Sequence, residues 1–161
     1  MASPLPVPQP FRVLFVCSGN ICRSPLAEAV FRKLAADAGL AERFEIDSAG
    51  MHGFHEGEPA DPRTRRVAKR HGYDVTSISR PVRGDDLERF DLIVAMDRSH
   101  KRELLARGGK ACAGKIRLLR EFDRSADPDV PDPYYGGERG FEDVQAIVEA
   151  GCRGLLNHLG A

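Results

Sequence analysis

Two residues six positions apart, Cys17 and Arg23, place a thiol and a planar cation close together in the chain. A thiolate is a strong nucleophile, and a guanidinium can hold two oxygens of an oxyanion through parallel hydrogen bonds. Ser24 follows directly, and its hydroxyl can donate a hydrogen bond to the sulfur. In a chain with 24 Lys and Arg residues this spacing alone is weak evidence for a functional site, so its interpretation depends on the flanking elements.

The flanking residues predict a buried strand before this loop and a helix after it. Residues 11–16, FRVLFV, form a short β-branched and aromatic run that is typical of a strand buried on both faces of a parallel sheet. Ser24 and Pro25 suit the N-cap and first position of a helix that Gly39 ends. The loop therefore precedes a helix N-terminus, where unpaired N–H groups and the helix dipole favour an anion.

The composition of the loop suits such an anion site. Gly19 permits a tight turn and Asn20 tolerates a positive φ, so the loop can curl with its N–H groups inward. The same surroundings favour the thiolate form of Cys17, aimed at the phosphorus of a bound phosphate in line with the leaving oxygen. The loop residues predicted to surround the phosphate, besides Cys17 and Arg23, are Ser18, Gly19, Asn20, Ile21, Cys22 and Ser24.

The rest of the chain alternates predicted strands and helices. Strands are expected at residues 44–48, 91–96 and 115–119, and helices at 61–71, 98–107 and from Phe141 to Leu159. This alternation predicts right-handed βαβ units and a doubly wound parallel sheet, which binds ligands at the carboxyl ends of its strands. Gly151 and Gly154 each cost about 1 kcal/mol relative to Ala inside the last helix, so its C-terminal half is expected to be weak.

Composition narrows the class of protein. The net charge is +0, which argues against nucleic acid or an anionic membrane as the main partner. The chain has no apolar run of about 20 residues, and residues 1–10, MASPLPVPQP, are expected to be a disordered Pro-rich leader without a secretion signal. The 4 cysteines show neither disulfide-framework nor metal-ligand spacing, so a cytoplasmic location is expected.

The loop also resembles a known family. Residues 16–28, VCSGNICRSPLAE, are similar to the loop of the low-molecular-weight protein tyrosine phosphatases, and the likeness extends to DSAG at 47–50, AMD at 95–97 and DPYYG at 132–136. It implies one α/β domain over residues 11–161, with a four-stranded parallel sheet in the order 2-1-3-4 and helices on both faces. It further implies a monomeric enzyme that hydrolyses phosphotyrosine in proteins, needs no cofactor or metal, and is inhibited by its product, inorganic phosphate.

The resemblance assigns further roles one residue at a time. It implies that Asp132 is the general acid, which the chemistry needs because a departing phenolate has a parent pKa of about 10. It also implies that Asn20 and Ser48 support the loop and that Tyr134 and Tyr135 form one wall of the cleft. At two positions this chain differs from relatives: Phe54 stands where many have Trp, and Ser77 stands where some have a supporting His.

Several alternatives remain open at this stage. Cys22 is either an inert neighbour of Cys17 or its partner in a reversible disulfide, as the family suggests. An arsenate reductase uses the same loop but needs two further cysteines in one mobile segment, whereas Cys112 and Cys152 are far apart. A catalytically silent phosphate-binding module would be expected to lack the nucleophile, the arginine or the acid.

A protein-arginine phosphatase is the other close alternative. Its loop has Thr where this chain has Ile21, and its acid segment lacks the paired tyrosines found here at Tyr134 and Tyr135. These residues favour phosphotyrosine as the substrate.

Overall fold

The computed structural model describes residues 10–160, so nearly all of the Pro-rich leader expected at residues 1–10 lies outside the described residues. Within this range no helix is long and apolar enough to cross a bilayer.

A four-stranded parallel sheet forms the centre of the molecule. Its strands are β1 (Phe11–Cys17), β2 (Phe44–Gly50), β3 (Leu92–Ala95) and β4 (Ile116–Leu118). The strand order is β2-β1-β3-β4 and every pairing is parallel, which confirms the predicted fold class and strand order. The chain moves outward from β1 to one side and then to the other, so a topological switch point lies at the carboxyl end of β1.

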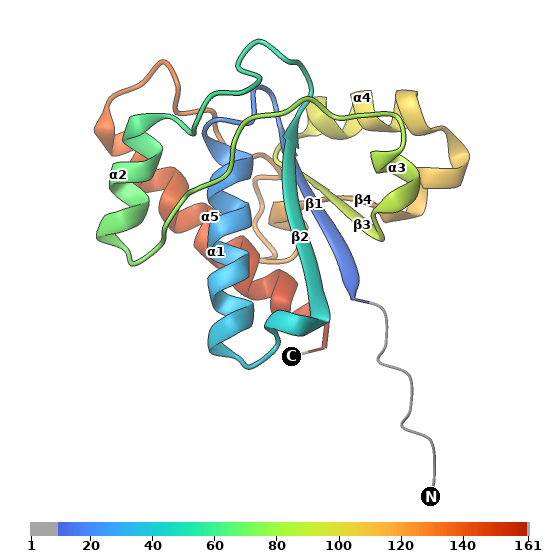
Figure 1. Ribbon diagram of the computed structural model, residues 1–161, viewed down its shortest axis with the longest axis horizontal. Coiled ribbons are helices and arrows are strands. Elements are labelled where there is room, and N and C mark those ends of the chain that lie inside the picture. The colour runs from blue at the N-terminus through green and yellow to red at the C-terminus, as the bar shows by residue number, and fades with distance from the viewer. Residues whose placement is uncertain (1–9, 161) are drawn as a thin grey trace, which may run out of the picture.

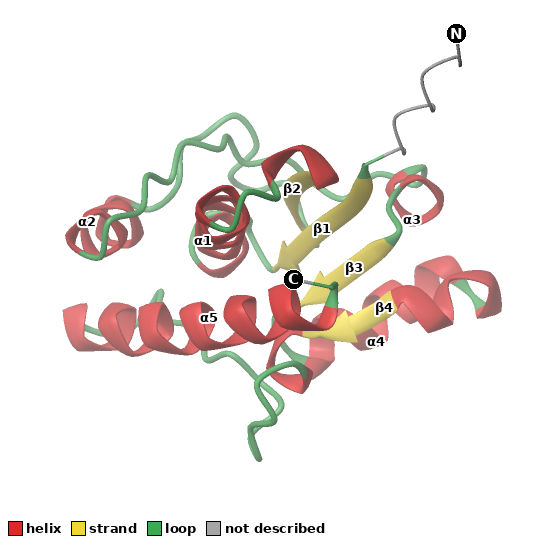
Figure 2. Ribbon diagram, turned by 90° about the horizontal axis from the view of Figure 1, so that it is seen from below, coloured by secondary structure: helices red, strands yellow, loops and turns green. Residues whose placement is uncertain are grey.

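Helices cover both faces of this sheet. They are α1 (Arg23–Asp37), α2 (Pro62–Arg70), α3 (Asp86–Arg89), α4 (Arg98–Gly108) and α5 (Glu138–His158), with 3₁₀ helices η1 (Ala41–Arg43), η2 (Lys110–Lys115) and η3 (Leu119–Glu121). Figures 1 and 2 show α1 and α5 on one face of the sheet, α3 and α4 on the other, and α2 beside α1 and α5. The short helix α3 was not predicted, because four residues give no measurable helical period.

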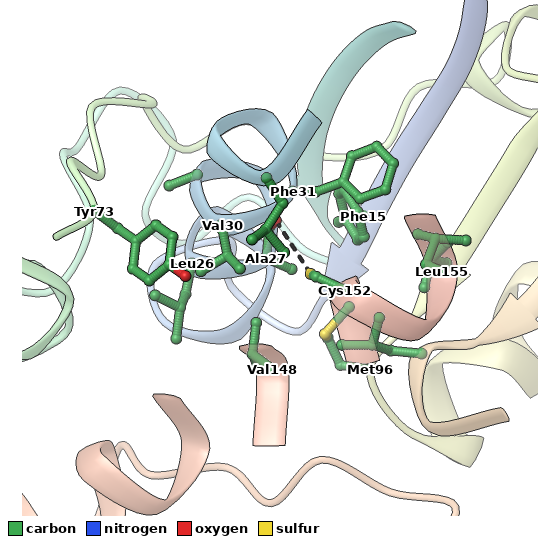
Figure 3. Packing of buried hydrophobic residues seen from close by; sticks show 14 of the residues in the cluster. Phe15, Leu26, Ala27, Val30, Phe31, Tyr73, Met96, Val148, Cys152 and Leu155 are labelled. Atoms are coloured by element: carbon green, nitrogen blue, oxygen red, sulfur yellow. Dashed lines mark hydrogen bonds between the residues drawn. The ribbon is translucent and has the colours of Figure 1, made fainter. Parts of the chain in front are cut away.

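The alternation of side chains along β1 explains the two-sided core. Val13 and Phe15 pack with α1 and α5, whereas Leu14 and Val16 point to the face covered by α3 and α4. Figure 3 shows the first cluster, in which the Phe15 and Phe31 rings lie 5.8 Å apart between centroids. Since both faces are covered by helices, β1 must be apolar at successive positions, and this is the pattern seen in the sequence.

The start of α1 differs from the prediction. The helix begins at Arg23 and its N-cap residue, Cys22, makes no side-chain capping bond, whereas Ser24 was expected to be the cap. The Ser24 hydroxyl lies 2.9 Å from the Cys17 sulfur instead. The N–H groups of the first turn are therefore not satisfied by a side-chain cap.

The two glycines in the last helix have a packing role that outweighs their low helix propensity. A Cβ at Gly151 would lie 2.6 Å from Leu119 Cγ, and one at Gly154 would lie 2.1 Å from the carbonyl oxygen of Phe122. Only glycine lets α5 approach η3 and the residue after it this closely. The helix continues through both glycines to His158, and these glycines bring this half of α5 into contact with the core although each lowers its helix propensity.

We predict that Gly154→Ala destabilises the protein by about 2 kcal/mol or more, although Ala is normally the better helix former. The matched control is Gly140→Ala in the same helix, where a Cβ would lie 3.8 Å from Pro133 Cβ in ordinary contact. That control should leave the free energy of unfolding unchanged or raise it by up to about 1 kcal/mol. Urea unfolding followed by circular dichroism measures both, and equal effects would contradict the packing argument.

Candidate active site

Several carbonyl groups of the loop between β1 and α1 accept hydrogen bonds from other segments. The carbonyl of Cys17 accepts from Met51 N–H at 2.8 Å, that of Ser18 from His52 N–H at 3.2 Å, and that of Gly19 from Ser79 Oγ at 2.9 Å. Among the described residues, no hydrogen bond is donated by the N–H groups from Ser18 to Arg23. The loop therefore has a concave inner surface of unpaired donors, the arrangement that binds an oxyanion.

Asn20 holds this curled shape. It has a φ of 57°, in the left-handed region, and is 1% exposed. Its Nδ2 donates to Ser24 Oγ at 2.8 Å and to Ser48 Oγ at 3.0 Å, while its Oδ1 accepts from Arg80 N–H at 3.1 Å. These three bonds fix a backbone conformation that a non-glycine residue adopts only when its surroundings impose it.

Two supports of the loop were missed by the sequence analysis. Glu28 is 4% exposed and accepts the Ser48 hydroxyl at 2.6 Å, so that the Ser48 oxygen is free to accept from Asn20; burial raises the pKa of Glu28. Ser79 supports the Gly19 carbonyl, whereas Ser77, the residue at the family's His position, makes no hydrogen bond among the described residues. Ser79 lies in an irregular segment, and a serine there gives no sequence signal for a supporting role.

The Cys17 sulfur lies at the carboxyl end of β1 and is almost fully enclosed, with 2% of the residue exposed. It is 2.9 Å from Ser24 Oγ. Because Ser24 Oγ accepts from Asn20 Nδ2, its own proton can point at the sulfur at 2.9 Å or at the Ala49 carbonyl, which is farther away at 3.4 Å. The predicted Ser24–sulfur contact is therefore geometrically in place.

Arg23 is buried, with 3% exposed, and is held from one side. Its Nη1 donates to Asp97 Oδ2 at 2.9 Å and to the Val130 carbonyl at 3.0 Å. Its Nη2 donates to Ser18 Oγ at 3.3 Å, and its Nε makes no hydrogen bond among the described residues. The Nε–Nη2 edge thus remains available for a bidentate contact with an oxyanion.

Asp97 and His100 complete the surroundings of Arg23. Asp97 was predicted only as the N-cap of the helix at Arg98, and it does cap α4, with Oδ1 accepting from His100 N–H at 3.1 Å. Burial raises the pKa of Asp97, but hydrogen bonds from Ser99, the His100 N–H and Arg23 outweigh this effect and lower the pKa overall. His100 is 3% exposed and its Nε2 lies 2.8 Å from Ser18 Oγ. No sequence pattern distinguishes His100, since it lies in the first turn of a largely polar helix.

A pocket of about 370 Å³ opens over the loop. It is lined by Cys17, Ser18, Gly19, Ile21, Cys22, Arg23, His52, Phe54, His55, Asp132, Tyr134 and Tyr135. The structure thus gathers most of the predicted site residues in one cavity and adds His52 and His55. Asn20, Ser24 and Ser48 are absent from the lining and lie buried beneath the loop as its supports.

The mouth of the pocket is formed by exposed aromatic rings. Phe54 is 84% exposed and Tyr135 92% exposed, and the Tyr134 and Tyr135 rings pack edge to face with 4.9 Å between centroids. Asp132 lies among them, with Oδ2 3.5 Å from Arg23 Nη2 and Oδ1 accepting the N–H of Tyr134 at 3.0 Å. An aromatic ring entering the pocket would therefore be bordered by apolar rings and would meet a carboxyl group.

The four cysteines are all free thiols and lie in different environments. Cys22 is buried, and burial raises its pKa from 9.0 to about 12. Cys112 packs in the core on one face of the sheet and Cys152 in the core on the other. The described residues contain no cluster of three or more His, Cys, Asp or Glu side chains suited to a metal ion.

Together, a thiol at the end of a parallel strand, a ring of unpaired N–H groups at a helix N-terminus and a buried arginine define an α/β protein with an oxyanion site beside a thiol. Comparison with known proteins identifies the family within this class. Residues 12–161 match the model of the family described as low molecular weight phosphotyrosine protein phosphatase.

The similarity to individual members spans nearly the whole chain. A low molecular weight protein-tyrosine-phosphatase of Streptomyces coelicolor is 51% identical over 91% of this chain and 92% of its own length. The human low molecular weight phosphotyrosine protein phosphatase is 42% identical over 89% of this chain and 92% of its own length. A crystal structure of a protein tyrosine phosphatase from Entamoeba histolytica superposes with a TM-score of 0.90 at 47% identity, covering 92% of this chain and 96% of that one. The chain belongs to the low molecular weight phosphotyrosine protein phosphatase family.

We predict that Cys22 resists alkylation in the folded protein. A pKa of about 12 in place of 9.0 leaves roughly a thousandfold less thiolate at neutral pH, and the thiolate is the reactive form. Treatment with iodoacetamide near pH 7 followed by peptide mass spectrometry should find Cys22 unmodified in the folded protein and modified in urea. Equal labelling of Cys22 in both states would show that burial does not protect it.

Proposed function

We propose that this chain hydrolyses phosphotyrosine in protein substrates through a cysteinyl-phosphate intermediate, within a single catalytic domain over residues 11–161. The observation that carries the proposal is the ring of unpaired N–H groups from Ser18 to Arg23 beside the Cys17 sulfur. These donors are in place before any substrate arrives, so they can stabilise the equatorial charge of a phosphoryl group in the transition state without reorganising.

In the first step the Cys17 thiolate attacks phosphorus, a sulfur–phosphorus bond forms, and the bond from phosphorus to the phenolic oxygen breaks. Arg23 holds two equatorial oxygens through its free Nε–Nη2 edge. Asp132, protonated at this stage, gives its proton to the leaving oxygen, so that tyrosine departs neutral. The Ser24 hydroxyl, 2.9 Å from the sulfur, stabilises the thiolate before attack.

In the second step water attacks the phosphorus of the intermediate. Asp132, now a carboxylate, takes a proton from that water, the sulfur leaves as the thiolate, and inorganic phosphate is released. The Ser24 hydroxyl again stabilises the negative sulfur. The same N–H groups that bind the substrate bind the product, so inorganic phosphate is expected to be a competitive inhibitor.

The aromatic mouth supports phosphotyrosine over smaller phosphoamino acids. The sulfur lies at the floor of the pocket, and Phe54, Tyr134 and Tyr135 line its walls. A phosphorylated aromatic ring reaches the sulfur while its own faces contact these rings. Phosphoserine is shorter and offers no ring to this wall.

Arsenate reduction finds less support. It requires two further cysteines that can reach Cys17, but Cys112 and Cys152 are buried in cores on opposite faces of the sheet. Burial also raises the pKa of Cys152, which keeps it a thiol.

The test compares phosphate release from matched phosphotyrosine, phosphoserine and phosphoarginine peptides by the wild type and by Cys17→Ser. Release from phosphotyrosine alone, lost in the variant, is the expected result. Release chiefly from phosphoarginine would assign the chain to the related arginine phosphatases, and release unaffected by Cys17→Ser would overturn the nucleophile assignment.

A second prediction concerns the general acid. Asp132→Asn should lower kcat for phosphotyrosine by about 10²–10³-fold, and by much less for an aryl phosphate whose phenol is strongly acidic and needs no proton to leave. Asp127→Asn, in the same loop but outside the pocket lining, is the matched control. An equal loss on both substrates would mean that Asp132 does not protonate the leaving group.

A further inference from the structure

His100 is a buried imidazole with no part in the two chemical steps proposed above. It lies in the first turn of α4, with 3% exposed, between Ser18 and Asp97. Its Nε2 is 2.8 Å from Ser18 Oγ, and its Nδ1 is 3.3 Å from Asp97 Oδ1. Those two neighbours each contact Arg23, at 3.3 Å from Ser18 Oγ to Nη2 and 2.9 Å from Asp97 Oδ2 to Nη1. The four side chains therefore close a ring around one side of the guanidinium.

The chemistry of the ring fixes the positions of its protons. Nδ1 of His100 faces a carboxylate oxygen, so a proton at Nδ1 is favourable and a lone pair there is repelled. The lone pair of the neutral imidazole is then on Nε2, and the Ser18 hydroxyl donates to it. Since arginine can only donate, the Ser18 oxygen accepts from Arg23 Nη2. The contacts of Ser18 with His100 Nε2 and with Arg23 Nη2 then each have one donor and one acceptor, whereas Nδ1 stands 3.3 Å from Asp97 Oδ1 without a hydrogen bond.

The surroundings keep this imidazole neutral. Burial, and then the positive charge of Arg23, lower the pKa of His100 to about 4, although the negative charges of Asp97, Asp132 and Glu103 act in the opposite direction. Near neutral pH the Nε2 lone pair is accordingly available to Ser18. A second proton on the ring would turn Nε2 into a donor, and the Ser18 oxygen would then face donors from two sides.

We propose that His100 is a positioning residue for phosphate binding, which it serves by fixing the hydroxyl of Ser18 as an acceptor for Arg23. The inference rests on the proposed phosphate site. Asp97 and Val130 hold Nη1, and Ser18 holds Nη2, so the plane of the guanidinium is set from both ends and its Nε–Nη2 edge faces the pocket. Without His100 the Ser18 hydroxyl can rotate and turn its proton toward Nη2, which repels it.

The test is a double-mutant cycle on the affinity for inorganic phosphate, measured by isothermal titration calorimetry. Ser18→Ala and His100→Leu should each weaken binding roughly tenfold, the effect of losing one hydrogen bond to a charged group. Because His100 acts through Ser18, the double variant should bind only about as weakly as either single variant. A double variant weakened about a hundredfold would show independent effects and overturn the proposal.

Two further variants separate positioning from mere packing. His100→Gln keeps an acceptor for Ser18 and should bind phosphate within about threefold of the wild type, whereas a loss equal to that of His100→Leu in a folded protein would count against the proposal. Ser125→Ala is the matched control, since among the described residues the Ser125 hydroxyl accepts only the Asp127 N–H, at 3.3 Å, and lies outside the pocket lining. It should leave phosphate affinity within about twofold.

The wild-type protein provides a measurement that does not depend on any variant folding. A long-range ¹H–¹⁵N spectrum of histidine-labelled protein reports which ring nitrogen carries the proton, and His100 is expected to be protonated at Nδ1 only. A proton at Nε2 would overturn the proposal. Phosphate binding and the tautomer need no turnover, so both readouts stay interpretable if phosphotyrosine hydrolysis itself is not found.

Discussion

The loop from Cys17 to Arg23 has most of its carbonyl groups hydrogen-bonded and its N–H groups from Ser18 to Arg23 unpaired among the described residues, and the rest of the site depends on this asymmetry. The segment after β2 and the Ser79 hydroxyl occupy the carbonyls from outside, which forces the donors to face inward. Buried N–H groups without partners are costly, so the concave surface is suited to an anion. The left-handed conformation of Asn20 is what allows the chain to turn in so few residues.

The buried charge of Arg23 imposes a second condition. A guanidinium that is 3% exposed needs partners, and Asp97 and the Val130 carbonyl supply them on the side away from the pocket. Asp97 also caps α4, so one carboxylate fixes both a helix and the arginine. The geometry of the anion site is therefore tied to the way α4 follows β3, and the loop before α5 contributes through Val130.

The walls of the pocket differ from its floor in solvent exposure and in what holds their side chains. The floor is buried and held by hydrogen bonds, whereas the rings of Phe54 and Tyr135 are 84% and 92% exposed. Rings so exposed gain contact area when a substrate ring enters. In the proposed function, the floor thus provides chemistry common to phosphate esters, and the walls provide selection for the group that carries the phosphate.

Local patterns in the sequence determined the alternation of strands and helices and hence a parallel sheet, while the family resemblance supplied the strand order and most of the pocket residues. An apolar run before a helix start marks β1, and a short motif with fixed spacing places Cys17 and Arg23 at its end. The resemblance also marked Asp132, Tyr134 and Tyr135 in a separate segment, and the structure brings them to the same pocket. Only the tertiary structure revealed Ser79, Asp97 and His100 as neighbours of the loop, and the packing reason for Gly154. Their partners lie on elements distant in the chain, and a polar side chain carries no periodic signal that says which element it will meet.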